Sequence, residues 1–418
     1  MSGHAVSSGQ SIYRRLFWPV YAPSILFGIA AGATIPVQVI AAMQLGASAS
    51  QAALVVAVVG AVALATTVPA GALIDRLGDR RSMLFATLTV SLFTLLTIAA
   101  LVRGPGSLWL FVLALVGRAP AANVWSLARQ AFVADRVASH EVGRAMTALG
   151  GTMRAGNLVG PLLGGLLLLR LPLWSVFVLS VVCALLAVAV LYTPSLGGRL
   201  EASRTTASAV PRRGDGDQAG PLPVDWTRVV LAGVAILTLA VARVSQPVVL
   251  QLWGFHSGLS ESVISLLVAV GAGIELVLMI PGGHFKDTLG RAPILVTCLL
   301  VYGSGFLLMV PLTGWLGLAG ITLAVVVMAV GNGLGAGINM TIGADLSPAQ
   351  GRGRFLGTWA LFSNAGVLGG PLLLSAFVGL VSVAWAVASV GVLAVAGAGW
   401  VVLFARRLAL PSGIGGKG

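Results

Sequence analysis

The sequence predicts an all-α membrane protein with twelve transmembrane helices, arranged as two six-helix bundles related by pseudo-two-fold symmetry. Three observations predict this fold class. Charged residues are scarce, apolar runs of membrane-spanning length recur along the whole chain, and the second half repeats motifs of the first half in the same order.

The composition excludes an ordinary water-soluble protein. Hydrophobic residues make up 57% of the 418 positions and charged residues 9%, and the mean hydropathy is +0.99. Soluble domains hold about 25% charged residues. So few charges cannot cover a water-facing surface of this size, and we expect lipid to cover most of it.

The apolar runs are long enough to cross a bilayer one by one. Ser82–Leu101, for example, holds about 20 residues without a charge, which is the length that a hydrocarbon core requires. The first run is too long for a cleavable signal peptide and has no small-x-small cleavage site. The two cysteines lie within runs of opposite halves, which predicts no disulfide or metal framework. The runs lie near 17–44, 51–74, 82–102, 107–129, 145–169, 173–193, 228–253, 262–282, 292–312, 315–340, 354–379 and 381–405.

The basic residues predict the orientation of these spans. Of the 25 Lys and Arg, three lie within spans, two lie in odd-numbered loops (Arg103 and Arg170), and the others lie in the tails and the even-numbered loops. The positive-inside rule therefore places both termini in the cytoplasm. The location predicted is a bacterial-type inner (plasma) membrane, and the net charge of +13 reflects topology rather than nucleic-acid binding.

A polar segment divides the chain into six spans and six spans. It is rich in Gly, Ser, Pro and Arg and has no apolar periodicity, which is typical of a flexible linker. The predicted division is an N-terminal bundle (1–194), a cytoplasmic linker (195–226) and a C-terminal bundle (227–418). The alternative to a plain tether is a regulatory or partner-binding role.

The two halves repeat at a spacing of about 210 residues. GRAMTALGGTMRAGNLVGPLLGG (Gly143–Gly165) aligns with GRFLGTWALFSNAGVLGGPLLLS (Gly353–Ser375), and Ala134-Asp135 recurs as Ala344-Asp345. GALIDRLG (Gly71–Gly78) aligns with GHFKDTLG (Gly283–Gly290). Six spans per half give both halves the same orientation, which indicates parallel repeats about an axis along the membrane normal.

The loop after the second span, GALIDRLGDRRSML, resembles the signature loop of the major facilitator superfamily, and the resemblance extends over essentially the whole chain. Asp79 departs from the signature, and Thr288 replaces its usual arginine in the second copy. The resemblance implies that Asp75 pairs with the other half to latch the cytoplasmic side closed; the alternative is a positively charged turn. Gly71 is expected to allow close helix packing. The predicted cytoplasmic gate comprises Gly71, Asp75, Arg76, Gly78 and Arg80, and Gly283, Asp287, Gly290 and Arg291.

Two motifs of the first half refine the resemblance. Arg118, in the fourth span, matches an arginine that the superfamily ties to proton coupling; a structural ion pair is the alternative. The fifth span carries G-x-x-x-G-P-x-x-G-G, which resembles the twelve-helix drug:proton antiporter group; a generic glycine-lined helix contact is the alternative. The resemblance to this antiporter group also favours export over import. This antiporter motif comprises Gly156, Gly160, Pro161, Gly164 and Gly165.

Glu275 is the carboxylate placed well inside a span, so it is the predicted proton carrier. Removal from water makes a carboxylate easier to protonate, and nearby arginine opposes this effect. Reversible protonation and a structural Glu–Arg pair therefore stay open as alternatives.

The resemblance implies a central cavity between the bundles. Three arginines against Glu275 give a predicted excess of two positive charges, which favours neutral or anionic amphipathic compounds, although Arg243 could lie near the outer surface. The predicted lining residues, besides Glu275 and Arg118, are Gln38, Arg154, Asn157, Arg243, Gln246, Asn332, Asn339, Trp359, Phe362 and Asn364.

The predicted function is a secondary active transporter, a proton-coupled exporter of amphipathic small molecules of the multidrug efflux type that works by alternating access. The alternatives are an exporter of an anionic metabolite, lipid or siderophore, and an importer of the same fold. The expected partners are the small-molecule substrate, protons and membrane lipid, without nucleic acid, and the chain is expected to be a monomer. No enzyme activity, cofactor or metal is predicted, because the four histidines lie in the N-terminal tail or loops and no phosphate-binding G-x-x-x-x-G-K motif is present.

Overall fold

The computed structural model describes residues 16–137, 142–192, 224–348, 352–408 and 410–411. These residues form helices and no strand. The helices of the first half are η1 (Phe17–Tyr21), α2 (Ala22–Thr34), η2 (Ile35–Val37), α3 (Gln38–Gln44), α4 (Ala49–Ala65), α5 (Thr67–Leu77), α6 (Asp79–Arg103), α7 (Leu108–Arg136), α8 (Val142–Leu168) and α9 (Trp174–Tyr192). Those of the second half are α12 (Trp226–His256), α13 (Glu261–Leu289), α14 (Arg291–Leu316), α15 (Leu318–Leu334), α16 (Ile338–Leu346), α17 (Arg352–Leu380), α18 (Val383–Leu403) and α19 (Ala405–Leu408).

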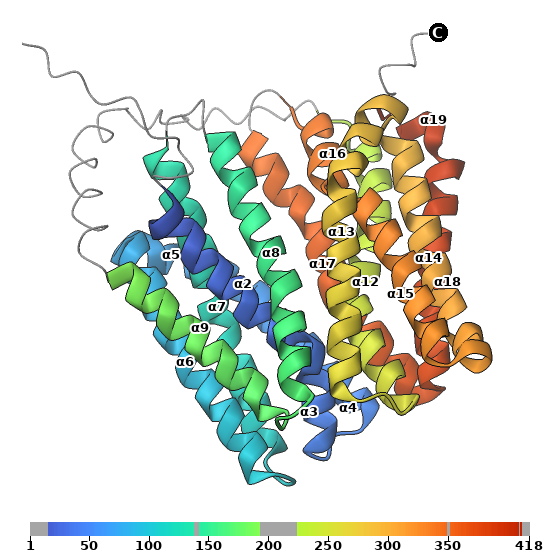
Figure 1. Cartoon of the computed structure of the whole chain (residues 1–418). Helices are drawn as coiled ribbons and strands as arrows, with labels where there is room; N and C mark the ends of the chain where they lie inside the picture. Colours follow the sequence, from blue (N-terminus) through green and yellow to red (C-terminus); the bar gives the residue numbers. More distant parts are fainter. Residues whose placement is uncertain (1–15, 138–141, 193–223, 349–351, 409, 412–418) are drawn as a thin grey trace, which may run out of the picture.

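The helices form two bundles, with η1–α9 in one and α12–α19 in the other (Figure 1). Among the described residues, ten helical stretches are long and apolar enough to cross a membrane, and the bent pair α4–α5 makes an eleventh span. α8, where we predict a further span, is not among them. It carries Arg154 and Asn157 and several glycines, which lower its hydropathy. The predicted fold class is confirmed. The predicted linker lies outside the described residues up to position 223.

The first two spans are not regular helices. Pro36 lies in the short 3₁₀ segment η2, which separates α2 from α3. α4 and α5 meet at an angle of 48°. Pro69 lies in the first turn of α5 and has no N–H to donate. At this bend the carbonyl of Ala63 accepts hydrogen bonds from the hydroxyl of Thr67 and the amide of Asn123, which satisfy the backbone where the helix is interrupted.

The span predicted at 315–340 is broken into α15 and α16. Gly335, Ala336 and Gly337 separate the two helices, and Gly337 has a φ of 77°, a conformation that glycine adopts without strain. Broken helices of this kind leave carbonyls free at membrane depth, where they need a partner or must line a cavity.

The repeat seen in the sequence corresponds to equivalent local structures. Gly78 and Gly290 have φ values of 77° and 92°, and each separates two helices on one face of the molecule. A Cβ atom on Gly156 would lie 2.5 Å from the Cα of Gly28, and one on Gly366 would lie 2.6 Å from the Cβ of Ala240. α8 therefore packs on α2 as α17 packs on α12.

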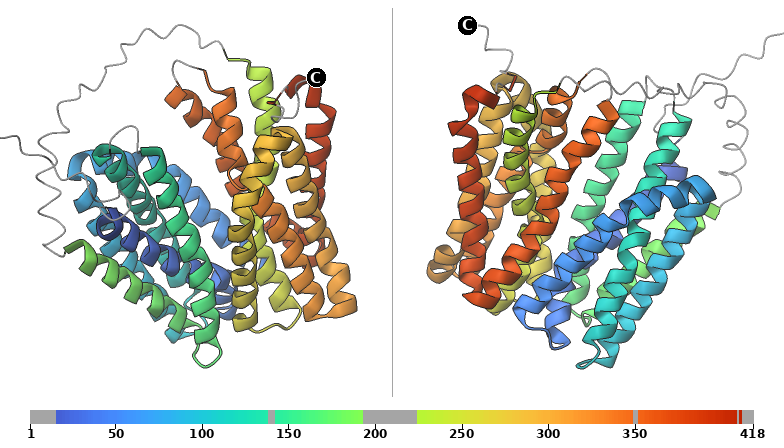
Figure 2. Two further views of the ribbon diagram at one scale, coloured as in Figure 1. Left: turned by 45° about the horizontal axis from the view of Figure 1, so that its top comes forward. Right: turned by 180° about the vertical axis from the view of Figure 1, so that it is seen from behind.

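The two bundles meet at one end of the molecule. Figures 1 and 2 show the bundles converging near α3 and α4 and diverging toward the end where α12 begins and α19 ends. We call the first end the hairpin face and the second the terminal face. The largest cluster of buried apolar side chains runs from α3 and α4 through α12 to α18, so it joins the bundles toward the hairpin face.

Hydrogen bonds between the bundles reinforce this contact. The buried amide of Gln251, in α12, accepts from the backbone N–H of Val39 at 2.8 Å and donates to the carbonyl of Ile35 at 3.0 Å. Ile35 is the first residue of the 3₁₀ segment of the first span, and Val39 lies just after that segment. Further contacts join Gln44 to Glu261 at 2.7 Å, Ser50 to Ser375 at 2.8 Å and Ser265 to the Pro161 carbonyl at 2.9 Å.

Candidate substrate cavity and proton site

A polar cavity of about 310 Å³ lies between the two bundles. Its lining combines two arginines, one carboxylate and two amides, and most of these side chains come from the C-terminal bundle. The lining residues are Arg154, Asn157, Arg243, Ala272, Glu275, Leu276, Asn332 and Ala336. A cavity of this size, lined by a few convergent polar groups, is typical of a small-molecule site.

Side chains of the C-terminal bundle form a polar network around Glu275. Arg243 donates through Nε to the Oδ1 of Asn332 at 2.7 Å, and the Tyr302 hydroxyl donates to the Oε1 of Gln246. The amides of Asn332 and Gln246 both interact with the Glu275 carboxylate. The network thus connects α12, α13, α14 and α15 at the cavity wall.

Arg243 and Lys286 stabilise the break between α15 and α16. One Nη of Arg243 donates to the carbonyl of Gly335 at 2.8 Å, and Nζ of the buried Lys286 donates to the carbonyl of Ala336. Carbonyls at the C-terminal end of a helix carry partial negative charge, which cations compensate. The break is therefore held by two cationic side chains, one of which also faces the cavity.

α8 brings the N-terminal bundle to the cavity through Arg154 and Asn157. Its position depends on backbone contact with α2, because added Cβ atoms on Gly156 or Gly160 would lie 2.5 Å from atoms of α2. Arg154 makes no hydrogen bond or ion pair within the described part of the chain. Its charge nevertheless acts on Glu275, as does that of Arg243.

The predicted antiporter motif contacts two helices, α2 of its own bundle and α13 of the other bundle. Gly156 and Gly160 face α2, whereas a Cβ on Gly165 would lie 2.8 Å from Leu266 of α13. Pro161 offers its carbonyl to Ser265, also of α13. The close helix approach expected from this motif is present, and the motif also contributes to the contact between the bundles.

Arg243 also lines a second cavity, of about 330 Å³. Its wall is largely apolar, and Arg243, Asn339 and Ser363 supply its polar groups. The remaining lining residues are Ile236, Leu239, Ala240, Val244 and Val367. Arg243 therefore lies in both cavities and not near the outer surface, the alternative that its position in the sequence left open.

Several residues predicted to line the cavity lie elsewhere. Gln38, Arg118 and Asn364 line neither of these two cavities. Trp359 is buried, and its indole donates to the side chain of Asn339 at 2.8 Å. Phe362 packs against α12 at Gly233. Because Arg118 is absent from the polar cavity, the excess there is one positive charge, not the two that the sequence predicts.

The predicted gate loops differ between the bundles. Asp75 and Arg76 are exposed, and Asp75 makes no hydrogen bond or ion pair within the described part of the chain. Arg80 donates to the Leu191 carbonyl at 2.8 Å, within its own bundle. A Cβ on Gly71 or Gly283 would meet nothing within 4 Å, so the close packing expected at Gly71 is absent in this conformation.

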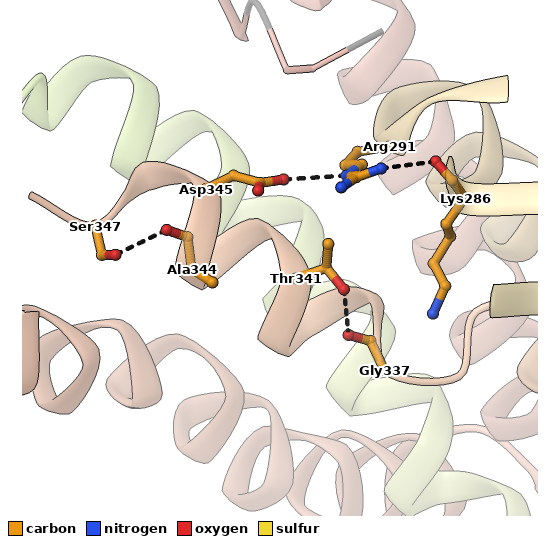
Figure 3. A network of polar contacts seen from close by, with 7 residues as sticks. All are labelled: Lys286, Arg291, Gly337, Thr341, Ala344, Asp345 and Ser347. Atoms are coloured by element: carbon orange, nitrogen blue, oxygen red, sulfur yellow. Dashed lines mark hydrogen bonds and ion pairs between the residues drawn. The ribbon is translucent and has the colours of Figure 1, made fainter. Parts of the chain in front are cut away.

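In the C-terminal bundle the gate loop is tied to the bundle itself. Arg291 pairs with Asp345 at 3.1 Å and donates to the Lys286 carbonyl at 2.9 Å (Figure 3). Gly290 supplies the turn between α13 and α14. The side chain of Asp287 lies outside the described part of the structure.

Lys286 and Tyr302 are functional candidates that the sequence reasoning did not identify. The signal for Lys286 is the string GNGLGAG (Gly331–Gly337), in which every second residue is glycine and which predicts a broken helix. Free carbonyls at such a break require donors. Tyr302 has no comparable local signal, because its partner Gln246 lies 56 residues away.

The comparisons with known proteins agree with this architecture. The sequence profile of the Major Facilitator Superfamily matches residues 20–242 and 231–417. No curated protein matches the sequence. A solved POT family transporter in complex with 5-aminolevulinic acid has a TM-score of 0.75 at 12% identity, and the match covers 95% of this chain and 97% of that one.

Two sugar transporters are also similar in fold. A D-xylose–proton symporter has a TM-score of 0.72 at 14% identity, covering 96% of this chain and 99% of its own. The xylose transporter XylE from E. coli, in an inward-open conformation, has a TM-score of 0.71 at 15% identity, covering 96% and 97%. Because the profile matches span both bundles, the chain belongs to the Major Facilitator Superfamily of membrane transporters.

Proposed function

We propose that this chain is a proton-coupled exporter of amphipathic small molecules that works by alternating access. The terminal face is the cytoplasmic face of a bacterial-type plasma membrane. The two bundles rock about the cavity between them, so that the contact closing the hairpin face opens when the terminal face closes. The glycine–proline pattern of α8 supports export, because it resembles that of the drug:proton antiporters. A neighbour in fold is described as a D-xylose–proton symporter, which supports proton coupling.

The observation that carries the proposal is the position of Glu275. It lies in a cavity between the bundles, opposite Arg154 of the other bundle. Its carboxylate interacts with the amides of Asn332 and Gln246, each of which is hydrogen-bonded to a further side chain. An ionisable group inside a membrane bundle is energetically costly, and such groups typically face a cavity and mark ion or proton pathways. Glu275 is therefore the proposed proton carrier.

A second candidate function is the transport of an amphipathic anion, for uptake or for export down its own gradient. It is supported by the charges of the cavity, where two guanidinium groups face one carboxylate. A cationic substrate would be repelled there more strongly than in water, because the low dielectric constant strengthens charge interactions.

The test is flux into proteoliposomes under an imposed pH gradient, with cationic, neutral and anionic compounds. We expect the gradient to accelerate flux in the unsubstituted protein and not in Glu275→Gln, while exchange without a gradient continues in both. Asp225→Asn is the matched control, because the Asp225 carboxylate caps α12 and contacts only its own helix. Normal acceleration in Glu275→Gln would contradict the role of Glu275.

A further inference from the structure

The donors left free in the polar cavity suit an oxyanion. Arg154 has no partner within the described residues, and Arg243 uses Nε and one Nη for Asn332 and Gly335, which leaves its other Nη for a ligand. Arginine presents planar, paired N–H donors that match a carboxylate or a phosphate. The exposed amide of Asn157 lies on the same side as Arg154.

The charged groups that face Glu275 come from both bundles. Arg243 of α12 and Arg154 of α8 attract its carboxylate, and Asn332 and Gln246 contact it. Tyr302 and Cys298, both of α14, also interact with it electrostatically. Both are much weaker acids than a carboxylate. Arg154 is the member of this set that belongs to the N-terminal bundle, and it makes no hydrogen bond or ion pair within the described residues.

We propose that the substrate is an amphipathic organic anion, and that it binds to Arg154 while Glu275 takes up a proton, so that both cross the membrane in the same direction. The inference rests on the proposed role of Glu275 as the proton carrier of this cavity and develops the second candidate function, the transport of an amphipathic anion. It names the substrate class and the sign of the coupling, and coupling of this sign makes an inward proton gradient drive uptake rather than export.

Electrostatics makes the two binding events favour each other. With Glu275 ionised, an anion at Arg154 meets a second negative charge and competes with it for the guanidinium. With Glu275 protonated, the anion faces two uncompensated arginines. The anion therefore binds more tightly when the proton is present, and by reciprocity the proton binds more tightly when the anion is present. A cation would show the opposite sign.

The second cavity accounts for the apolar part of the substrate. Five aliphatic side chains, Ile236, Leu239, Ala240, Val244 and Val367, dominate its wall, and Arg243 joins it to the polar cavity. An acid group held at Arg154 and Arg243 thus has an apolar space beside it. This arrangement favours a carboxylate or phosphate attached to a hydrophobic body over a small inorganic anion.

The test uses three probes that share one hydrophobic body and differ in charge: phenylbutyrate, phenylbutyramide and phenylpropyltrimethylammonium. Binding to the purified full chain is measured by titration calorimetry in two buffers of different ionisation enthalpy, which gives the protons taken up or released. We expect phenylbutyrate to bind with proton uptake. Its affinity should rise about 5-fold to 100-fold from about pH 8 to about pH 6, the usual range of coupling between sites.

Two substitutions test whether binding of the anion is coupled to protonation of Glu275. Glu275→Gln, which mimics the protonated carboxyl group, should bind phenylbutyrate tightly at both pH values without proton uptake. Asp225→Asn, whose carboxylate contacts only its own helix, should behave as the unsubstituted protein. Proton release on binding phenylbutyrate, tightest binding by the cation, or binding of none of the three probes would overturn the inference. If the pH gradient still drives flux through Glu275 in such a case, the proposed function stands and only the substrate class and the coupling sign are wrong.

Discussion

Arg243 shows how little the position of a residue along a helix says about its role. Counting along the seventh span leaves open a position near the outer surface. In the structure Arg243 lies in both cavities and binds Asn332, 89 residues away, and Gly335, 92 residues away. Arg118 shows the reverse, because its central position predicts a cavity residue and the structure places it in neither cavity.

Arg154 provides the sharpest test at the residue scale. We expect Arg154→Gln to weaken phenylbutyrate binding about 10-fold to 100-fold, because a hydrogen bond to a charged group contributes about 1.5–3 kcal/mol. Binding of phenylbutyramide should change little. Arg170→Gln, exposed in a loop, is the control. If cations bind tightest and Arg154→Gln changes nothing, the cavity does not select by charge.

Glycine has different structural roles in different helices, close packing in one and a break of the helix in another. In α8, Gly156 and Gly160 allow backbone contact with α2, whereas Gly150 and Gly151 face open space. At the end of α15, glycine permits the break that exposes two carbonyls. The sequence pattern is similar in these places, and only the neighbouring element distinguishes them.

Two alanine substitutions in α8 test this distinction. Gly156→Ala places a Cβ 2.5 Å from the Cα of Gly28, where only backbone can move, so we expect a loss of about 1–3 kcal/mol in the free energy of unfolding. Gly150→Ala meets nothing within 4 Å and should be neutral or gain about 0.5–1 kcal/mol. Thermal unfolding in detergent measures both. Equal midpoints would show that α2 and α8 are not in close contact.

Gln251 tests the contact between α12 and the first span. Gln251→Leu removes the partners of the Val39 N–H and the Ile35 carbonyl, and each unsatisfied buried group costs about 1–3 kcal/mol. We expect the hairpin face to open more often. Labelling of a cysteine introduced as Ser50→Cys, with Cys183 and Cys298 replaced by alanine, should become faster.

The control for Gln251 is Gln130→Leu, because the amide of Gln130 bonds only within α7. It should leave the labelling rate unchanged. Equal labelling in all three proteins would show that the Gln251 contact does not hold the hairpin face closed.

On the scale of the whole molecule, the structure shows one of the two conformations that the proposed alternating access requires. The contacts between bundles gather toward the hairpin face, and Asp75 on the terminal face has no partner within the described residues. The predicted latch is thus not engaged here. We expect the latch to form in the other conformation, in which the bundles would meet at the terminal face.

We therefore expect Asp75→Asn to disfavour that other conformation and to raise the share of molecules open at the terminal face. The measurement is labelling of Asn157→Cys in the cavity from the terminal side, which should become faster, and Asp287→Asn should have a weaker effect. Asp225→Asn is the control, because asparagine also caps a helix and Asp225 contacts only its own helix. Unchanged labelling in both gate variants would remove the latch hypothesis.

The sequence by itself determined the fold class, the approximate spans and the repeat. These depend on hydropathy and on motifs within one segment, which are local properties of the chain. The tertiary structure decided which polar residues share a cavity, the break after α15, the roles of Lys286, Tyr302 and Gln251, and the reduction of the charge excess to one. Those outcomes depend on how each helix is rotated and tilted against neighbours 50 to more than 200 residues away, and a hydropathy pattern that is apolar on all sides does not fix that rotation.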